Sequence, residues 1–283
     1  MIFSSSPTKS PLPTQPALAV LLRGIGTAVP DFSASQEQTL AFISERFQVA
    51  ERTKQLYKKT LRNKSIEKRH FGLGNLENVL DQDLDRKNAR FEKEAVALST
   101  RALQAALANA GVSPAALDFL VVTTCTGYIC PGLSSHVLEA CGLRPDVRTA
   151  DLVGMGCGAA IPALDQAHNF LLANPGKTAA VISTEICSAA MVSSDEIDIV
   201  ISNTIFADGS AAVVLSSEID RSEQTPPLAP PRLGGELEFV VFYGFDEEMD
   251  VFDGGAGEDP MAEIKNVAGA ARGLGQYALR FIF

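Results

Sequence analysis

Over the first 220 residues of the chain, the hydrophobic and polar positions form two kinds of pattern, one typical of strands and one typical of helices. Short apolar, β-branched runs of strand length alternate with longer segments in which apolar residues recur at helical spacing. The predicted strands are 18–29, 119–124, 147–153, 179–185 and 210–216. The predicted helices are 36–47, 91–110, 133–141, 159–172 and 196–206. Strands that alternate with helices predict an α/β domain, with a layered sheet and helices on both of its faces.

Local signals fix some of these boundaries. Ser35 followed by Gln38 has the spacing of a capping box at the start of a helix. Gly111 predicts the end of the helix over 91–110, and the polar, acidic segment 75–90 predicts a surface loop. The helix over 159–172 is apolar over most of its surface, so we expect it to be buried, with His168 as a structural histidine.

The two ends of the chain differ in composition from the segment between them. Residues 1–16 are rich in Ser, Pro and Thr, which predicts a disordered tail. The α/β pattern spans 17–220, and 221–283 is an atypical segment rich in proline, glycine and acidic residues. The apolar run 17–22 is too short for a signal peptide or a membrane span, so we expect a soluble, cytoplasmic protein.

Composition narrows the function classes. With 283 residues and 46% hydrophobic residues the chain can bury a sizeable core. A net charge of -10 argues against general affinity for nucleic acid or anionic membranes. The five cysteines are an odd number and lack the C-x2-C spacing of metal sites, which predicts reduced thiols and no bound metal.

One basic segment stands out in this acidic chain, over residues 52–69. It holds eight lysines and arginines against a single acid, Glu67, with Glu51 just before it. Such a run is compatible with a solvated helix face, and equally with a rim that neutralises phosphate oxygens.

Candidate chemistry centres on Cys157, which lies between Gly156 and Gly158. The segment is placed where a predicted strand turns into a helix. A thiol at a helix N-terminus lies beside unpaired backbone N–H groups at the positive end of the helix dipole, which predicts a lowered thiol pKa. A buried, unreactive cysteine in a tight turn is the alternative.

Several separate motifs resemble those of the type III polyketide synthases, the chalcone and stilbene synthase family within the thiolase superfamily. The resemblance covers residues 22–217, about two thirds of the chain. The motifs are GIGTAVP at 24–30, SIEKR at 65–69, VVTTCTG at 121–127 followed by Pro131 and Gly132, GLRP at 142–145, GMGCGAA at 154–160, VISTE at 181–185 and FADGSAA at 206–212.

The resemblance implies a thiolase-like layered α/β/α fold and a cysteine nucleophile. In that family the cysteine at the position of Cys157 attacks a starter acyl-CoA and carries the acyl chain as a thioester. Malonyl-CoA then supplies the carbanion that extends it. The implied substrates are therefore coenzyme A thioesters, no further cofactor is expected, and the implied assembly is a homodimer.

Further residues receive roles from the same resemblance. Phe206 matches the aromatic residue that gates the passage between the coenzyme A tunnel and the cavity, although ordinary core packing would also explain it. Cys125 and Thr126 would line the cavity, and Cys130 would reach into the cavity of the neighbouring subunit. The other implied contacts are to the coenzyme A phosphates, by Lys59 and Arg62.

The chain departs from the family in one chemically important respect. Type III synthases use a histidine and an asparagine from their C-terminal half, and the only histidines here are His70, His136 and His168. The family's His-Pro-Gly-Gly, Gly-Asn-Met-Ser and Gly-Phe-Gly-Pro-Gly motifs do not occur in the sequence. We therefore expect impaired turnover. Alternatives are a non-catalytic thiolase-fold subunit that dimerises, a ketoacyl synthase III-like or hydroxymethylglutaryl-CoA synthase-like enzyme, and a truncated product without function.

Overall fold

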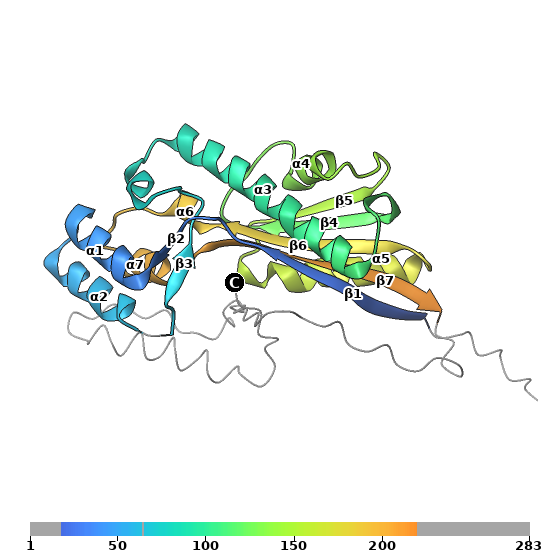
Figure 1. The fold of residues 1–283 in the computed structure, drawn as a ribbon, viewed down its shortest axis with the longest axis horizontal. Helices are drawn as coiled ribbons and strands as arrows, with labels where there is room; N and C mark the ends of the chain where they lie inside the picture. The colour runs from blue at the N-terminus through green and yellow to red at the C-terminus, as the bar shows by residue number, and fades with distance from the viewer. Residues whose placement is uncertain (1–17, 64, 220–283) are drawn as a thin grey trace, which may run out of the picture.

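The computed structural model describes residues 18–63 and 65–219. The predictions made for 1–16 and 221–283, and for the limits of the domain at 17 and 220, lie outside these residues. A five-stranded mixed sheet forms the centre of the molecule (Figure 1). Its strands, in spatial order, are β1 (Leu18–Ala28), β7 (Asp208–Ile219), β6 (Thr178–Ile186), β4 (Phe119–Thr124) and β5 (Arg148–Val153).

Helices cover both faces of this sheet, as the alternation of strands and helices predicts. The long helix α3 (Leu84–Ala110) and the shorter α4 (Leu133–Ala140) lie on one face, and α5 (Ala160–Ala173) lies on the other (Figure 1). One apolar core lies under α3 and α4, and a second, smaller core lies between α5 and the sheet. Among the described residues, no helix is both long enough and apolar enough to cross a membrane.

A third group of elements lies beyond one end of the sheet (Figure 1). It has its own core, in which the Phe47 and Tyr57 rings meet edge to face, with centroids 6.0 Å apart. Its elements are α1 (Gln36–Arg46), α2 (Glu51–Leu61), α7 (Ile197–Ile205) and the two-stranded sheet of β2 (Ser33–Ser35) and β3 (Lys68–His70). The four-residue helix α6 (Cys187–Ala190) connects this group to the end of β6.

Most of the predicted element boundaries agree with the structure to within a few residues. Strand β4 has the predicted limits, and the other four strands differ from prediction by one to three residues at an end. The capping box of α1 is present: the Gln38 backbone N–H donates to Ser35 Oγ over 3.0 Å, and the Ser35 N–H donates to Gln38 Oε1 over 2.8 Å.

The segment 75–90 is not a surface loop, so this prediction is wrong. It contains a 3-10 helix, η1 (Leu76–Leu80), and the first seven residues of α3. Asp83 caps α3 by accepting a hydrogen bond from the Arg86 N–H over 3.0 Å. Lys87 is buried one turn before Phe91, because its ammonium group donates to the Met191 carbonyl oxygen. Apart from Lys87, the polar residues over 84–90 therefore lie on the outer face of a helix, which ends at Gly111 as predicted.

The prediction that α5 is buried over most of its surface is also wrong. Its buried positions are Ala163, Ala167 and Leu171, which lie on one face at helical spacing. Ile161 and Leu172 lie on the outer face and are 37% and 41% exposed. His168 is exposed as well, so it is not a histidine of the core.

Contact between α3 and β1 depends on two glycines. A Cβ atom at Gly26 would lie 2.3 Å from the carbonyl oxygen of Ala102 and from the backbone nitrogen of Ala106. At Gly24 the corresponding contact to the Ala106 oxygen is 2.5 Å. Backbone atoms of a helix cannot move aside cheaply, so glycine is required for α3 to lie this close to the sheet.

Substitution of Gly26 by alanine is expected to destabilise the fold by about 1–3 kcal/mol, because the added methyl group displaces α3 from β1. Chemical denaturation monitored by circular dichroism measures this change. Gly158→Ala is the matched control, since a Cβ at Gly158 meets nothing within 4 Å. Equal midpoints for the two variants would show that α3 has room to move.

Candidate active site at the carboxyl edge of the sheet

Three parallel strands bring the predicted site residues to one edge of the sheet. Strand β4 pairs in parallel with β5 on one side and with β6 on the other. Thr124 is the register partner of Val153, and the Gly154 N–H donates to the Thr124 carbonyl oxygen over 3.0 Å. The residues that follow these strands therefore emerge side by side, at the edge where open α/β sheets bind ligands.

Cys157 lies where β5 gives way to α5, as the sequence predicts. One 3-10 turn, η3 (Cys157–Ala159), precedes α5, and Cys157 is exposed. Gly154 and Gly156 have φ angles of +75° and +72°, a left-handed conformation that side chains with a Cβ rarely adopt. These two glycines let the chain reverse direction and place Cys157 at the helix N-terminus.

Glu185, to which the sequence analysis gave no role, connects β6 to the loop after β4. One of its carboxylate oxygens accepts hydrogen bonds from the Thr126 N–H over 3.0 Å and from the Thr126 hydroxyl over 2.7 Å. The Cys125 N–H donates to the same carboxylate, 3.0 Å from Oε1. Thr126 Oγ1 in turn accepts from the Ile186 N–H over 2.8 Å. The signal for Glu185 was its position at the end of a buried strand.

The pKa of the Cys157 thiol is raised, whereas the sequence predicted that it is lowered. Although the residue is exposed overall, protein atoms around the sulfur partly desolvate it, and this is the largest cause. The negative charge of Glu185 adds to it, while the hydrogen bond from the backbone N–H of Cys157 acts in the opposite direction. Burial and Glu185 likewise raise the pKa of Cys125, to about 12. The prediction considered the helix terminus alone and did not anticipate a carboxylate beside the thiols.

A third thiol lies at the same edge. Cys187 begins α6, directly after the last residue of β6. Its pKa is raised well above the ordinary value, first by burial and then by the charges of Asp208 and Glu185. All three strands of the parallel group are thus followed by a cysteine, and a carboxylate raises the pKa of each of the three thiols.

Phe206 lies at the same end of the sheet, between α7 and β7. It caps the C-terminus of α7 and is half-buried. Its carbonyl oxygen accepts a hydrogen bond of 2.8 Å from Nη1 of Arg69, a buried residue of β3. Because Asp208 pairs with Ile186 at the end of β6, Phe206 extends just beyond the sheet edge that carries the thiols.

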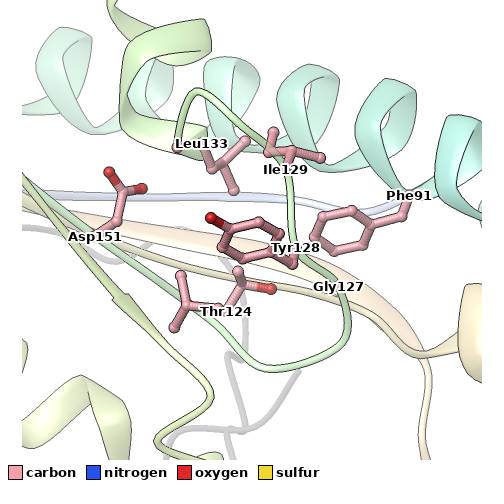
Figure 2. Close-up of a pocket in the computed structure, with 9 residues that line it drawn as sticks. Phe91, Thr124, Gly127, Tyr128, Ile129, Leu133 and Asp151 are labelled. Carbon is pink, nitrogen blue, oxygen red and sulfur yellow. The ribbon is translucent and has the colours of Figure 1, made fainter.

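A cavity of about 400 Å³ opens beside the loop after β4 (Figure 2). Figure 2 shows Thr124, Tyr128 and Asp151 around it, with Phe91 reaching in from α3. The Asp151 carboxylate accepts hydrogen bonds from the N–H and hydroxyl groups of Ser134 at the start of α4. Cys130 is exposed in the same loop but does not line this cavity. The other residues that the sequence predicted for an acyl site are not part of its lining either: Cys125, Thr126, Cys157 and Phe206.

The predicted phosphate-binding residues lie on a different element. Lys59 occupies the last turn of α2 and Arg62 caps that helix, and both side chains are exposed. Exposure is compatible with a solvated face and with a phosphate rim, so the structure leaves both interpretations open.

The three histidines lie on separate elements. His70 Nδ1 is hydrogen-bonded to the Pro30 carbonyl oxygen over 2.8 Å, and His136 lines a surface groove between α3 and α4. His168 lies on the exposed face of α5, about two turns from its start. All three histidines are among the described residues, and none of them is hydrogen-bonded to Glu185.

Comparison with known proteins adds an independent line of information. A family model described as FAE1/type III polyketide synthase-like protein matches residues 28–226. The chain is 30% identical over 243 residues to a 3,5-dihydroxyphenylacetyl-CoA synthase of Amycolatopsis orientalis, covering 81% of this chain and 61% of the relative. It is 27% identical to a 1,3,6,8-tetrahydroxynaphthalene synthase of Streptomyces griseus, covering 68% and 51%.

Solved structures agree with this relationship. The fold is similar to that of PKS-I from the brown alga Ectocarpus siliculosus, with a TM-score of 0.67 and 26% identity, over 74% of this chain and 58% of that one. It is also similar to the 1,3,6,8-tetrahydroxynaphthalene synthase of Streptomyces coelicolor A3(2), with a TM-score of 0.61 and 25% identity, over 68% and 56%. The predicted thiolase-like α/β fold is thereby confirmed, and the chain spans about half to three fifths of the length of these relatives.

Replacement of Glu185 by glutamine is expected to lower the pKa of Cys157, because it removes a negative charge that disfavours the thiolate. The rate of Cys157 alkylation by iodoacetamide, measured by peptide mass spectrometry across a pH series, should then rise at lower pH than in the unmodified chain. Glu77→Gln, which removes a surface carboxylate paired with Arg46, is the control. An unchanged pH profile in Glu185→Gln would contradict the electrostatic effect.

Proposed function

Because the chain belongs to the type III polyketide synthase family, which its residues 28–226 match, we propose that it is an acyltransferase that uses Cys157 as nucleophile. The supporting observation is the placement of Cys157 at a helix N-terminus on the ligand-binding edge of the sheet. The proposed substrates are an acyl-CoA starter and malonyl-CoA, with no additional cofactor. The proposed assembly is a homodimer in the cytoplasm.

The first chemical step follows from ordinary thioester exchange. Cys157 attacks the carbonyl carbon of the acyl-CoA as its thiolate, a new carbon–sulfur bond forms, and the bond from that carbon to the coenzyme A sulfur breaks. Coenzyme A leaves as a thiolate and takes up the proton that Cys157 has lost. Backbone N–H groups in the first turn of a helix can stabilise the oxyanion that develops on the carbonyl oxygen. Cys125 and Thr126, which Glu185 holds beside this edge, are proposed to line the acyl cavity, with Phe206 at its entrance and Cys130 directed to a neighbouring subunit.

The electrostatics argue that this step is slow in the chain as it stands. Burial and Glu185 both favour the neutral thiol, and an uncharged thiol is a poor nucleophile. The histidine and asparagine motifs of the family, which would oppose this effect, do not occur in the sequence. We therefore propose acylation of Cys157 with little or no complete polyketide formation.

A second candidate function is that of a non-catalytic subunit that dimerises, and the raised pKa of Cys157 favours it. In this function the dimer must form whether or not Cys157 is present. Light scattering should therefore give a dimer for both the unmodified chain and Cys157→Ala. A ketoacyl synthase III-like activity would use the same thiol. It differs from polyketide synthesis because it stops after one extension by a single malonyl unit.

Incubation with an acyl-CoA is expected to add one acyl group to the chain, detected by intact mass spectrometry. Cys157→Ala should abolish the adduct. Cys141→Ala is the matched control, because Cys141 is half-buried on the C-cap of α4, away from the parallel-strand edge. Adducts that persist in Cys157→Ala would assign acylation to another thiol, and no adduct in any variant would favour the non-catalytic subunit.

The proposed coenzyme A contacts can be tested in the same assay. Lys59→Gln and Arg62→Gln should each raise the acyl-CoA concentration for half-maximal loading by about three- to tenfold, through lost charge-assisted bonds to phosphate. Loading from an acyl-pantetheine, which lacks the nucleotide phosphates, should be unchanged. Lys93→Gln is the control, since Lys93 is exposed on α3. Equal effects on both donors would mean that these residues do not contact phosphate.

A further inference from the structure

Arg69 is a buried cation whose hydrogen bonds converge on the end of a helix. Its side chain is 3% exposed, although it lies on the short edge element β3. Nη1 donates to the carbonyl oxygens of Asn203 and Phe206, each over 2.8 Å, and Nε donates to Gln36 Oε1 over 3.0 Å. Two of these three bonds therefore end on backbone oxygens of the segment that leads from α7 into β7.

Gln36 extends this arrangement to a third carbonyl. Its amide nitrogen donates to the Thr204 carbonyl oxygen over 3.1 Å, and its own side chain is 7% exposed. The last carbonyls of a helix lack partners within the helix, and a cation at that end also complements the helix dipole. Arg69 and Gln36 together therefore determine how the chain leaves α7 at Phe206.

A second anchor holds the chain two residues later. The buried Asp208 carboxylate accepts hydrogen bonds from the Gly72 N–H over 2.5 Å and from the Ser188 N–H over 2.8 Å. Gly72 follows β3 closely, and Ser188 lies in α6 beside the thiols. Arg69 thus holds the carbonyl of Phe206 itself, and the Asp208 carboxylate anchors the chain two residues later, which leaves the backbone at Phe206 little freedom.

Burying the charged guanidinium of Arg69 costs desolvation free energy, so its directional hydrogen bonds must be what the position requires. Burial lowers the pKa of Arg69 to about 10, partly offset by the charge of Asp208. Among the described residues, no carboxylate forms an ion pair with it, and its Nη2 atom has no hydrogen-bond partner. The guanidinium also stacks on Phe71, 5.0 Å from the ring centroid. An apolar side chain could fill such a space at lower cost but could not bind the Phe206 carbonyl.

We propose that Arg69 is the positioning residue of Phe206, fixing the backbone at position 206 and hence the direction in which its ring leaves the chain. Arg69 acts through Phe206 and is not itself a catalytic residue. The inference rests on the proposed role of Phe206 at the entrance of the acyl cavity. Arg69 is the last residue of the SIEKR motif at 65–69, so the proposal gives this motif a function at the cavity entrance.

The absence of tryptophan from the sequence allows a direct test. In a Phe206→Trp background the single indole reports the environment of position 206. Adding Arg69→Gln is expected to raise the acrylamide quenching constant of this indole about twofold, because the entrance segment is released locally. Arg69→Lys should give an intermediate value, since an ammonium group can bind one carbonyl but cannot reproduce the planar fork.

Tyr57→Phe is the matched control for loss of a buried hydrogen bond at the same helix. The Tyr57 hydroxyl accepts from Asn203 Nδ2 over 2.9 Å and makes no bond to Phe206. We expect Tyr57→Phe to lower the melting temperature without changing the quenching constant. Quenching that is equal in Tyr57→Phe and Arg69→Gln, or unchanged in Arg69→Gln, would overturn the proposal.

Hydrogen exchange gives a second readout that does not require the tryptophan. In the chain with native Phe206, Arg69→Gln should accelerate amide exchange in the peptide that contains residues 203–209, whereas Tyr57→Phe should not. Neither measurement depends on acyl transfer. Failure to load Cys157 in the unmodified chain would therefore count against the proposed function alone, and unchanged quenching and exchange in Arg69→Gln would count against Arg69 alone.

Discussion

The parallel pairing of β4 with both of its neighbours is the constraint on which the candidate site depends. Parallel strands share a direction, so the residues after β5, β4 and β6 all emerge at one edge. Cys157, Cys125 and Glu185 are far apart in the sequence and meet there because of this register, together with the glycine turn that precedes Cys157. A slip of one residue in β4 would turn its alternate side chains to the other face and move Cys125 away from Glu185.

The same edge shows how hydrogen bonding and electrostatics oppose each other at the site. Glu185 accepts bonds from two backbone N–H groups and one hydroxyl, which fixes the loop that carries Cys125 and Thr126. Its charge also raises the pKa of the neighbouring thiols. The helix N-terminus at Cys157 offers partial positive charge, but the carboxylate and burial outweigh it. The carboxylate of Glu185 therefore fixes the loop after β4 and at the same time disfavours the Cys157 thiolate.

Sequence patterns predicted the main elements because each has a local cause. The continuous apolar run of β4 and the capping box of Ser35 and Gln38 both act within a few residues. The predictions that were wrong depend on partners distant in sequence. The start of α3 was missed because Lys87 is buried through a bond to Met191, and the short strands β2 and β3 exist only by pairing with each other. The exposed outer face of α5 could not be separated from its buried face by composition alone.

Residue roles were harder to predict than elements for the same reason. The position of Cys157 was predicted correctly because flanking glycines and a strand-to-helix transition are visible in the sequence, whereas its role stays a prediction. Glu185 and Arg69 are charged residues within family motifs, yet the backbone groups that they bind lie about 60 and more than 130 residues away. In both cases a partly or fully buried charge binds backbone groups of a loop instead of an opposite charge. Buried charges used in this way contribute little net stability, so their value lies in the geometry that they impose on Thr126 and Phe206. Glu185 and Arg69 thus act on the loop after β4 and on the end of α7, two segments that come close to them only in the folded chain.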